Sequence, residues 1–381
     1  MAETNTKIKN RQEGTAACRF MNGTHAVWSR LRSMPVLFML VAVWLVFILM
    51  SDAFLTVGNI ITLFVMNAIF AIAATGETFV LMTGGIDLSI AHNVTCSSII
   101  SATTMITYQT GAVNRMLNPG GAVMSLSELA KVDAIGKDAV SAATASTLGM
   151  TILIGLAVAL GVGLLIGAIN GVSVGVFRMT PFIVTLATQL LARGTAMVVS
   201  GGYSIPGTPK ELTRMSYATG IKFGDDLVIP WVIVILAGIV IVAGLLLGKT
   251  TWGRNIALVG ANEQSARYVG INVRGVLVSV YIVAGLLAGV AGFVTMMSLG
   301  TADPKVGDPI LITIIGSVIL GGVDMNGGDG SMAKAALGMF LFATLVNGMT
   351  FLNLTLALQQ IVQGTILIIG MTLLARLKPK R

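Results

Sequence analysis

Residues 148–170, LGMTILIGLAVALGVGLLIGAIN, contain no charged side chain. A helix needs about 20 apolar residues to cross the hydrocarbon core of a bilayer, so this stretch predicts a membrane span. The whole chain is similar: 55% of its residues are hydrophobic and 10% are charged, and its mean hydropathy is +0.89. Soluble domains carry roughly 25% charged residues. The composition therefore excludes a soluble enzyme and predicts an all-α polytopic membrane protein.

Charges and glycine clusters divide the chain into about ten predicted transmembrane helices. They lie near 34–51, 58–82, 90–108, 148–170, 181–200, 228–248, 276–298, 310–321, 333–351 and 358–376. This transmembrane domain, 34–376, is flanked by a basic N-terminal segment, 1–33, and a basic tail, 377–381, which the positive-inside rule places in the cytoplasm. An even number of spans puts the basic segment 249–275 there too. We interpret the net charge of +8 as a topology signal that also favours lipid headgroups, and not as a nucleic-acid site.

Two long gaps between the predicted spans fall on the opposite side of the membrane. Residues 109–147 mix Gly, Ser, Asn and balanced charges with short apolar runs, which is typical of an insertion. Residues 201–227 predict a short amphipathic element on the outer face. Both gaps offer room for a docking surface, but neither is long enough for a second folded domain.

Glycines repeat every four residues in one predicted span, at Gly163, Gly167, Gly171 and Gly175, and again at Gly285 and Gly289. This spacing lines one face of a helix with small residues and lets a neighbouring backbone approach closely. We expect this stripe to pack against another helix of the same chain rather than to form a dimer seam.

Polar side chains inside predicted spans are candidates for a translocation path, because burying them in hydrocarbon is costly. The candidates are Asn67, Glu77, Asp87, Asn93, Gln189 and Arg193. For Glu77 a role in helix packing is an open alternative, and for Arg193 an interfacial position is another.

The sequence predicts neither a metal nor a cofactor site in this chain. Two histidines and two cysteines are too few for a credible metal centre or a disulfide scaffold. Residues 243–250, AGLLLGKT, match a relaxed phosphate-loop pattern. They end an apolar helix with no preceding strand, so we do not expect this chain to bind ATP.

Two similar gapped motifs interrupt apolar runs: TGGIDLS at 83–89 and LGGVDMN at 320–326. Paired glycines (Gly84 with Gly85, and Gly321 with Gly322) followed by an acid, Asp87 in the first motif, favour breaks in two helices. Broken helices at membrane depth occur only where protein or a watery cavity surrounds them. The pattern alone leaves a second interpretation open, namely two turns at the membrane interface.

Four motifs in order along residues 36–376 carry a resemblance to a known family. They are GGIDLS (84–89); TPFIVTLA (180–187) followed by RG (193–194); GANE (260–263) leading to AR (266–267) and GI (270–271); and GG (321–322) ahead of GGDG (327–330). Together they resemble the membrane permease of a bacterial monosaccharide-type ABC importer, the ribose/xylose/galactose class. The N-terminal segment and residues 109–147 depart from that pattern.

The resemblance implies the ABC importer permease fold and several partners in the bacterial inner membrane. These are a second permease, identical or a sister subunit, a cytoplasmic ATPase that binds the ATP, and a periplasmic sugar-binding protein. It also implies a cytoplasmic coupling loop, 249–275, that docks on the ATPase through Asn262, Glu263, Arg267, Gly270 and Ile271. The residues agree independently, since Glu263 and Arg267 form an i,i+4 charged pair suited to a short helix.

Three functional hypotheses follow. The first is a permease subunit, not itself an enzyme, that passes a monosaccharide or related small polyol across the membrane when a partner hydrolyses ATP. The second is an ion-coupled secondary sugar carrier in which Glu77 and Asp87 bind the coupling ion. The third is a membrane scaffold without transport. The sequence does not name the sugar.

Overall fold

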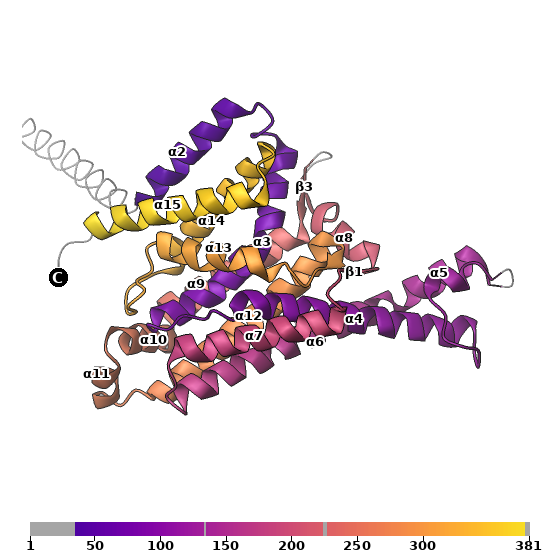
Figure 1. Cartoon of the computed structure of the whole chain (residues 1–381), viewed down its shortest axis with the longest axis horizontal. Helices are drawn as coiled ribbons and strands as arrows, with labels where there is room; N and C mark the ends of the chain where they lie inside the picture. Colours follow the sequence, from indigo (N-terminus) through magenta and orange to yellow (C-terminus); the bar gives the residue numbers. More distant parts are fainter. Residues whose placement is uncertain (1–34, 133–134, 224–226, 378–381) are drawn as a thin grey trace, which may run out of the picture.

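The computed structural model describes residues 35–132, 135–223 and 227–377. The basic N-terminal segment 1–33 and all but the first residue of the tail 377–381 lie outside the described residues. Figure 1 shows an almost entirely helical molecule in which long helices are joined by short connections. The expected all-α architecture is confirmed.

Ten helices correspond to the ten expected spans. They are α2 (Pro35–Met50), α3 (Val57–Met82), α4 (Ile90–Leu117), α6 (Gly136–Gly175), α7 (Pro181–Ser200), α9 (Trp231–Lys249), α12 (Val273–Leu299), α13 (Gly307–Leu320), α14 (Met332–Phe351) and α15 (Leu356–Leu377). Six of them, α3, α6, α7, α9, α12 and α14, are long and apolar enough to cross a membrane, while α2, α13 and α15 contain shorter apolar segments. α4 is more polar, and much of its polar surface is buried by neighbouring helices.

The remaining elements are short. They are α5 (Leu126–Leu129), α8 (Lys210–Tyr217), α10 (Thr251–Ala261) and α11 (Glu263–Tyr268), with strands β1 (Ile205–Pro206), β2 (Gly220–Phe223), β3 (Leu227–Pro230) and β4 (Thr301–Ala302). β1 pairs antiparallel with β4, and β2 with β3. α8 buries Leu212 and Ser216 and exposes Lys210 and Glu211, so the amphipathic element expected within 201–227 is confirmed.

The glycine stripe of α6 packs directly on α12. A Cβ atom added to Gly167 would lie 2.5 Å from the carbonyl oxygen of Tyr281 and 3.0 Å from Cα of Gly285. A Cβ on Gly163 would meet the backbone of Gly285 and Gly289 in the same way. The expected packing within one chain is therefore confirmed, and this crossing forms the centre of the molecule.

Residues 109–147, expected to be an insertion, are helical for most of their length. α4 continues to Leu117 and α6 begins at Gly136, while α5 covers the tip between them (Figure 1). With 40 residues, α6 is about 60 Å long, twice the thickness of a bilayer core. A small apolar cluster of Val113, Leu129 and Val140 holds this extension together. The hydropathy of the sequence indicates where lipid contact ends, whereas the helices α4 and α6 continue beyond that point.

Eight of the ten long helices form two packed groups. One contains α4, α6, α7 and α12, and the other contains α2, α13, α14 and α15 (Figure 1). α3 contacts both α12 of the first group and α13 and α14 of the second, and α4 also contacts α13. The tenth helix, α9, packs on α3 and α14.

Candidate translocation and coupling sites

The first gapped motif ends α3 and turns the chain back alongside it. Gly84 has a φ of 78° and closes the helix: its N–H donates to Leu81 O (2.9 Å), and the N–H of Gly85 donates to Val80 O (3.3 Å). This left-handed C-cap suits glycine. The chain then doubles back until the N–H of Asp87 donates to Oε1 of Glu77 at 3.1 Å. α4 begins only after this return.

Asp87 is the centre of a buried polar network that ties the turn to two further helices. Its Oδ1 accepts hydrogen bonds from the N–H and hydroxyl of Ser89 (2.9 and 2.5 Å) and from the amide of Asn170 in α6 (3.4 Å). Asn170 in turn accepts from the hydroxyl of Thr188 in α7 at 2.7 Å. Sequence reasoning missed Asn170 and Thr188, although both are polar residues within predicted spans.

The second gapped motif has the same local geometry. Gly322 has a φ of 95°, its N–H donates to Ile319 O (2.9 Å), and the N–H of Val323 donates to Val318 O (3.3 Å). Asp324 then accepts from the N–H of Asn326 (3.0 Å), as Asp87 does from Ser89. The equivalent glycines are thus Gly84 and Gly322, one residue out of register with the sequence match. Each motif follows the end of a helix, α3 or α13, which the broken-helix and the interfacial-turn interpretations predict alike.

Both gapped motifs meet the loop 249–275 at a glycine junction, formed by Gly84, Gly260, Gly327 and Gly328. The N–H of Gly328 donates to Met82 O at the end of α3 (3.0 Å). A Cβ added to Gly327 would lie 2.6 Å from the nitrogen of Gly84 and 2.9 Å from the oxygen of Gly260. Three segments far apart in sequence therefore touch backbone to backbone, with no side chain between them.

The loop 249–275 folds into α10 and α11, and each of its expected residues has a defined place in or beside α11. Asn262 caps the helix by accepting the N–H of Ser265 (2.8 Å), and Glu263 pairs with Arg267 one turn later. At the other end Gly270 adopts a φ of 83°, and the N–H of Ile271 donates to Ala266 O (3.0 Å). The local prediction of a short helix is confirmed, whereas its ATPase contact stays a prediction.

Two residues that sequence reasoning missed are strongly exposed in this loop. The side chains of Tyr268 and Val269 are 88% and 73% exposed. Large apolar groups so exposed beside a charged helix are typical of a contact surface. The signal was present in the sequence as an aromatic-aliphatic pair between the Glu263–Arg267 pair and Gly270.

A cavity of about 510 Å³ connects α11 to the first helix break. It is lined by Glu263, Gln264 and Arg267 of α11, by Thr83, Gly84 and Gly85 of the break, by Tyr281, Leu277 and Val273 of α12, and by the 174–181 connection from α6 to α7. A movement of α11 therefore has space on one side and the glycine junction on the other.

The structure brings only some of the candidate path residues together. Glu77 and Asp87 share the buried network, while Asn93 donates to Gly163 O (3.4 Å) and Gln189 is half-buried on α7. Asn67 donates to Leu63 O (2.6 Å) and borders two largely apolar cavities of about 380 Å³ each. Glu77 is fully buried, a position that suits the helix-packing alternative. The transport roles of all six stay predictions.

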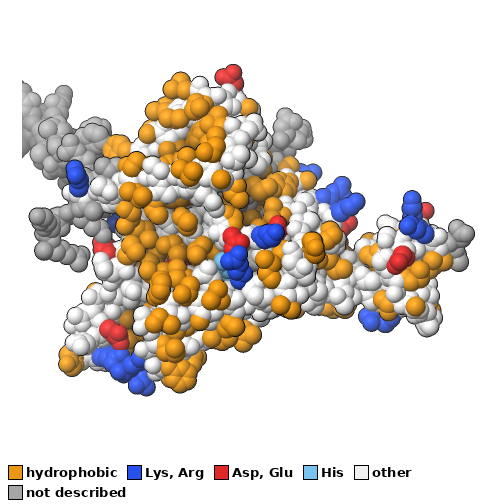
Figure 2. Space-filling view, in the orientation of Figure 1, with side chains coloured by type: hydrophobic (Ala, Val, Ile, Leu, Met, Phe, Trp, Pro, Cys, Tyr) orange, Lys and Arg blue, Asp and Glu red, His pale blue; other side chains and the backbone are white. Residues whose placement is uncertain are grey.

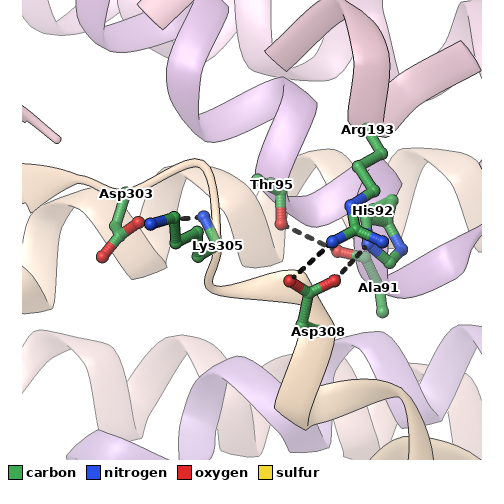
Figure 3. Close-up of polar contacts among 7 residues, drawn as sticks. All are labelled: Ala91, His92, Thr95, Arg193, Asp303, Lys305 and Asp308. Carbon is green, nitrogen blue, oxygen red and sulfur yellow. Dashed lines mark hydrogen bonds and ion pairs between the residues drawn. The ribbon is translucent and has the colours of Figure 1, made fainter. Parts of the chain in front are cut away.

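Arg193 lies in a separate charged cluster, shown in Figure 3. Its Nη2 donates to Oδ2 of Asp308 at 3.1 Å, and Nε2 of His92 lies 3.2 Å from Oδ1 of the same carboxylate. The three residues come from α7, α13 and α4. Sequence reasoning missed Asp308, because the eighth span was expected to begin at 310.

These features define a class of protein. Six long apolar helices, shorter apolar ones, and a loop whose backbone contacts both gapped motifs describe a polytopic helical membrane protein. The model of the family described as the branched-chain amino acid transport system/permease component matches residues 59–371. The chain belongs to this family. It is therefore the permease component of an ABC importer, a non-enzymatic membrane subunit, and neither an ion-coupled carrier nor a scaffold.

Curated relatives cover most of the chain. The ribose import permease protein of Bacillus subtilis is 32% identical over 89% of this chain and 91% of the relative. The D-allose transport system permease protein of Escherichia coli is 29% identical over 85% and 86%. The L-arabinose transport system permease protein of Escherichia coli is 28% identical over 77% and 76%. No solved structure matches.

Proposed function

We propose that this chain carries a monosaccharide or a related small polyol across the bacterial inner membrane, driven by ATP hydrolysis in a partner subunit. The observation that carries the proposal is the agreement of the relatives, whose names specify ribose, D-allose and L-arabinose, over three quarters or more of this chain. Both termini are cytoplasmic in this proposal, as their basic residues favour.

Three partners complete the transporter. A cytoplasmic ATPase binds and hydrolyses ATP, a periplasmic protein captures and delivers the sugar, and a second permease, identical or a sister subunit, forms the other half of the path. The extension of α4 and α6 lies at the end of the molecule away from α11 (Figure 1). In this orientation it projects into the periplasm, where the delivery protein docks.

The exposed pair Tyr268 and Val269, with Glu263 and Arg267, forms the ATPase contact. When ATP closes the ATPase, α11 moves with it, and the glycine junction passes this movement to both helix breaks at once. Support comes from the direct backbone contacts of Gly260, Gly327 and Gly84, since backbone atoms transmit displacement without rotamer changes.

The face that carries Arg193 and Asp308 lines the path. Their side chains are 45% and 39% exposed, on helices whose other outward residues, such as Leu190 and Ile312, are apolar. A charged pair facing lipid is costly, so a watery path shared with the second permease is the favourable surrounding.

Reconstitution tests this proposal directly. Proteoliposomes that hold the permease with the ATPase encoded beside it are given the cognate binding protein and radiolabelled D-ribose, D-allose or L-arabinose. We expect at least one of these sugars to be taken up. This uptake should require both the binding protein and ATP on the side of the membrane that the ATPase faces. Uptake driven by a proton or sodium gradient without ATP, or no uptake of any sugar, would contradict the proposal.

Replacing Tyr268 by alanine is expected to weaken binding of the ATPase about 30-fold, because exposed aromatic residues at such contacts often contribute about 2 kcal/mol. The measurement is the affinity of the purified permease for its ATPase in detergent or nanodiscs. Tyr203 is 80% exposed and follows α7, on the outer side in this orientation, so Tyr203→Ala is the matched control. Equal effects of the two substitutions would remove α11 from the ATPase contact.

A further inference from the structure

Two side chains from two helices converge on a carboxylate of a third helix. Asp308 is held on one oxygen by His92 of α4 and on the other by Arg193 of α7 (Figure 3). His92 is 2% exposed, whereas Asp308 and Arg193 are 39% and 45% exposed. The carboxylate and guanidinium are therefore open to a ligand from one side and supported by a buried imidazole from the other.

The pair joins the second half of α7 to the start of α13. Arg193 stands twelve residues after Pro181, about 18 Å along α7 at 1.5 Å per residue. Asp308 is the second residue of α13.

Hydrophobic side chains lie on several sides of the cluster. Figure 2 shows the pale-blue histidine with acidic and basic side chains at the centre of one face, with hydrophobic side chains around them. Asp303 and Lys305 lie next to the cluster, and the N–H of Lys305 donates to Asp303 (2.9 Å) (Figure 3). Isolated polar groups on apolar walls are the usual arrangement of a small-molecule site, where they fix orientation and provide specificity.

We propose that Asp308 and Arg193 form a sugar-binding pair within the translocation path. A carboxylate accepts hydrogen bonds from hydroxyls and a guanidinium donates to them, so adjacent sugar hydroxyls match the pair, since each hydroxyl both donates and accepts. Charge-assisted bonds of this kind are about twice as strong as neutral ones. The inference rests on the proposed function and adds the residues that recognise the substrate during passage.

His92 acts as a positioning residue. Its Nε2 donates to Oδ1 of Asp308 and leaves the remaining lone pairs of the carboxylate directed outward. His92→Phe removes this donor, whereas the amide of His92→Gln can still supply it. We therefore expect lower sugar transport in the Phe variant and recovery in the Gln variant, a difference that loss of bulk packing would not produce.

The test measures sugar molecules taken up per ATP hydrolysed, in proteoliposomes that contain the complete complex. The probe is whichever of D-ribose, D-allose and L-arabinose the wild type imports. Asp308→Asn and Arg193→Gln are each expected to lower this ratio about ten-fold or more, the loss of one charge-assisted hydrogen bond, while ATP hydrolysis stimulated by the loaded binding protein persists. The double variant keeps an amide-to-amide contact between α7 and α13, so it preserves the fold while it removes both charges.

Asp303→Asn is the matched control, because this neighbouring carboxylate is directed at Lys305 and away from the pair. An unchanged ratio in Asp308→Asn and Arg193→Gln would overturn the inference. A parallel fall in uptake, ATP hydrolysis and Tm would also overturn the inference, because the ion pair would then be a structural link between the helix groups. Failure of the wild type to import any of the sugars would overturn the proposed function and this inference together.

Discussion

Gly167→Ala is expected to destabilise the protein by about 3 kcal/mol, at the upper end of the cost of overpacking. The added Cβ would lie 2.5 Å from the carbonyl oxygen of Tyr281 and 3.0 Å from Cα of Gly285, and both atoms are backbone. Neither neighbour can rotate away, so α6 and α12 must separate along their whole crossing. The measurement is thermal unfolding of the purified permease in detergent, where we expect a Tm lower by roughly 5 °C or more.

Gly161→Ala in the same helix is the control. Gly161 is exposed, and a Cβ there would meet no atom within 4 Å. Alanine forms helix better than glycine by about 1 kcal/mol in water, so this variant should keep or raise the Tm. Equal Tm values for the two variants would mean that the close approach of α6 and α12 does not stabilise the fold.

The glycine crossing could be predicted because its information is local. Four glycines spaced by four residues must share a face of any helix, and a face without side chains has few uses in a membrane besides close packing. The ends of α4 and α6 could not be predicted in the same way. Polar residues between 109 and 147 end lipid contact, and sequence hydropathy does not distinguish a helix leaving the bilayer from a loop.

The candidate sites also differ in whether their structure depends on local sequence or on the packing of distant segments. The short helix α11 could be predicted because Glu263 and Arg267 lie one turn apart and pair with each other. The charged cluster could not, because Arg193 and Asp308 are 115 positions apart and nothing in either segment indicates the other. The gapped motifs are intermediate: their turns are local, but their meeting with Gly260 depends on the packing of the whole chain.

Gly260→Ala is expected to abolish ATP-driven sugar uptake while leaving the permease folded. A Cβ on Gly260 would overlap the carbonyl oxygen of Met82 and lie 2.6 Å from the nitrogen of Gly328, so α10 must move away from both helix breaks. At a cost of about 3 kcal/mol, the closed junction would be about 150-fold less populated. The measurements are uptake and ATP hydrolysis by the reconstituted complex, with Tm as the check on folding.

Gly248→Ala provides the comparison, since Gly248 lies near the end of α9 and a Cβ there would meet nothing within 4 Å. We expect this variant to transport as the wild type does. The two variants share the same chemical change near the same side of the membrane, and they differ in whether backbone contact with the helix breaks is lost. Normal uptake by Gly260→Ala would mean that coupling passes through side chains, with Arg267 and the cavity beside it as the remaining route from α11 to the first break.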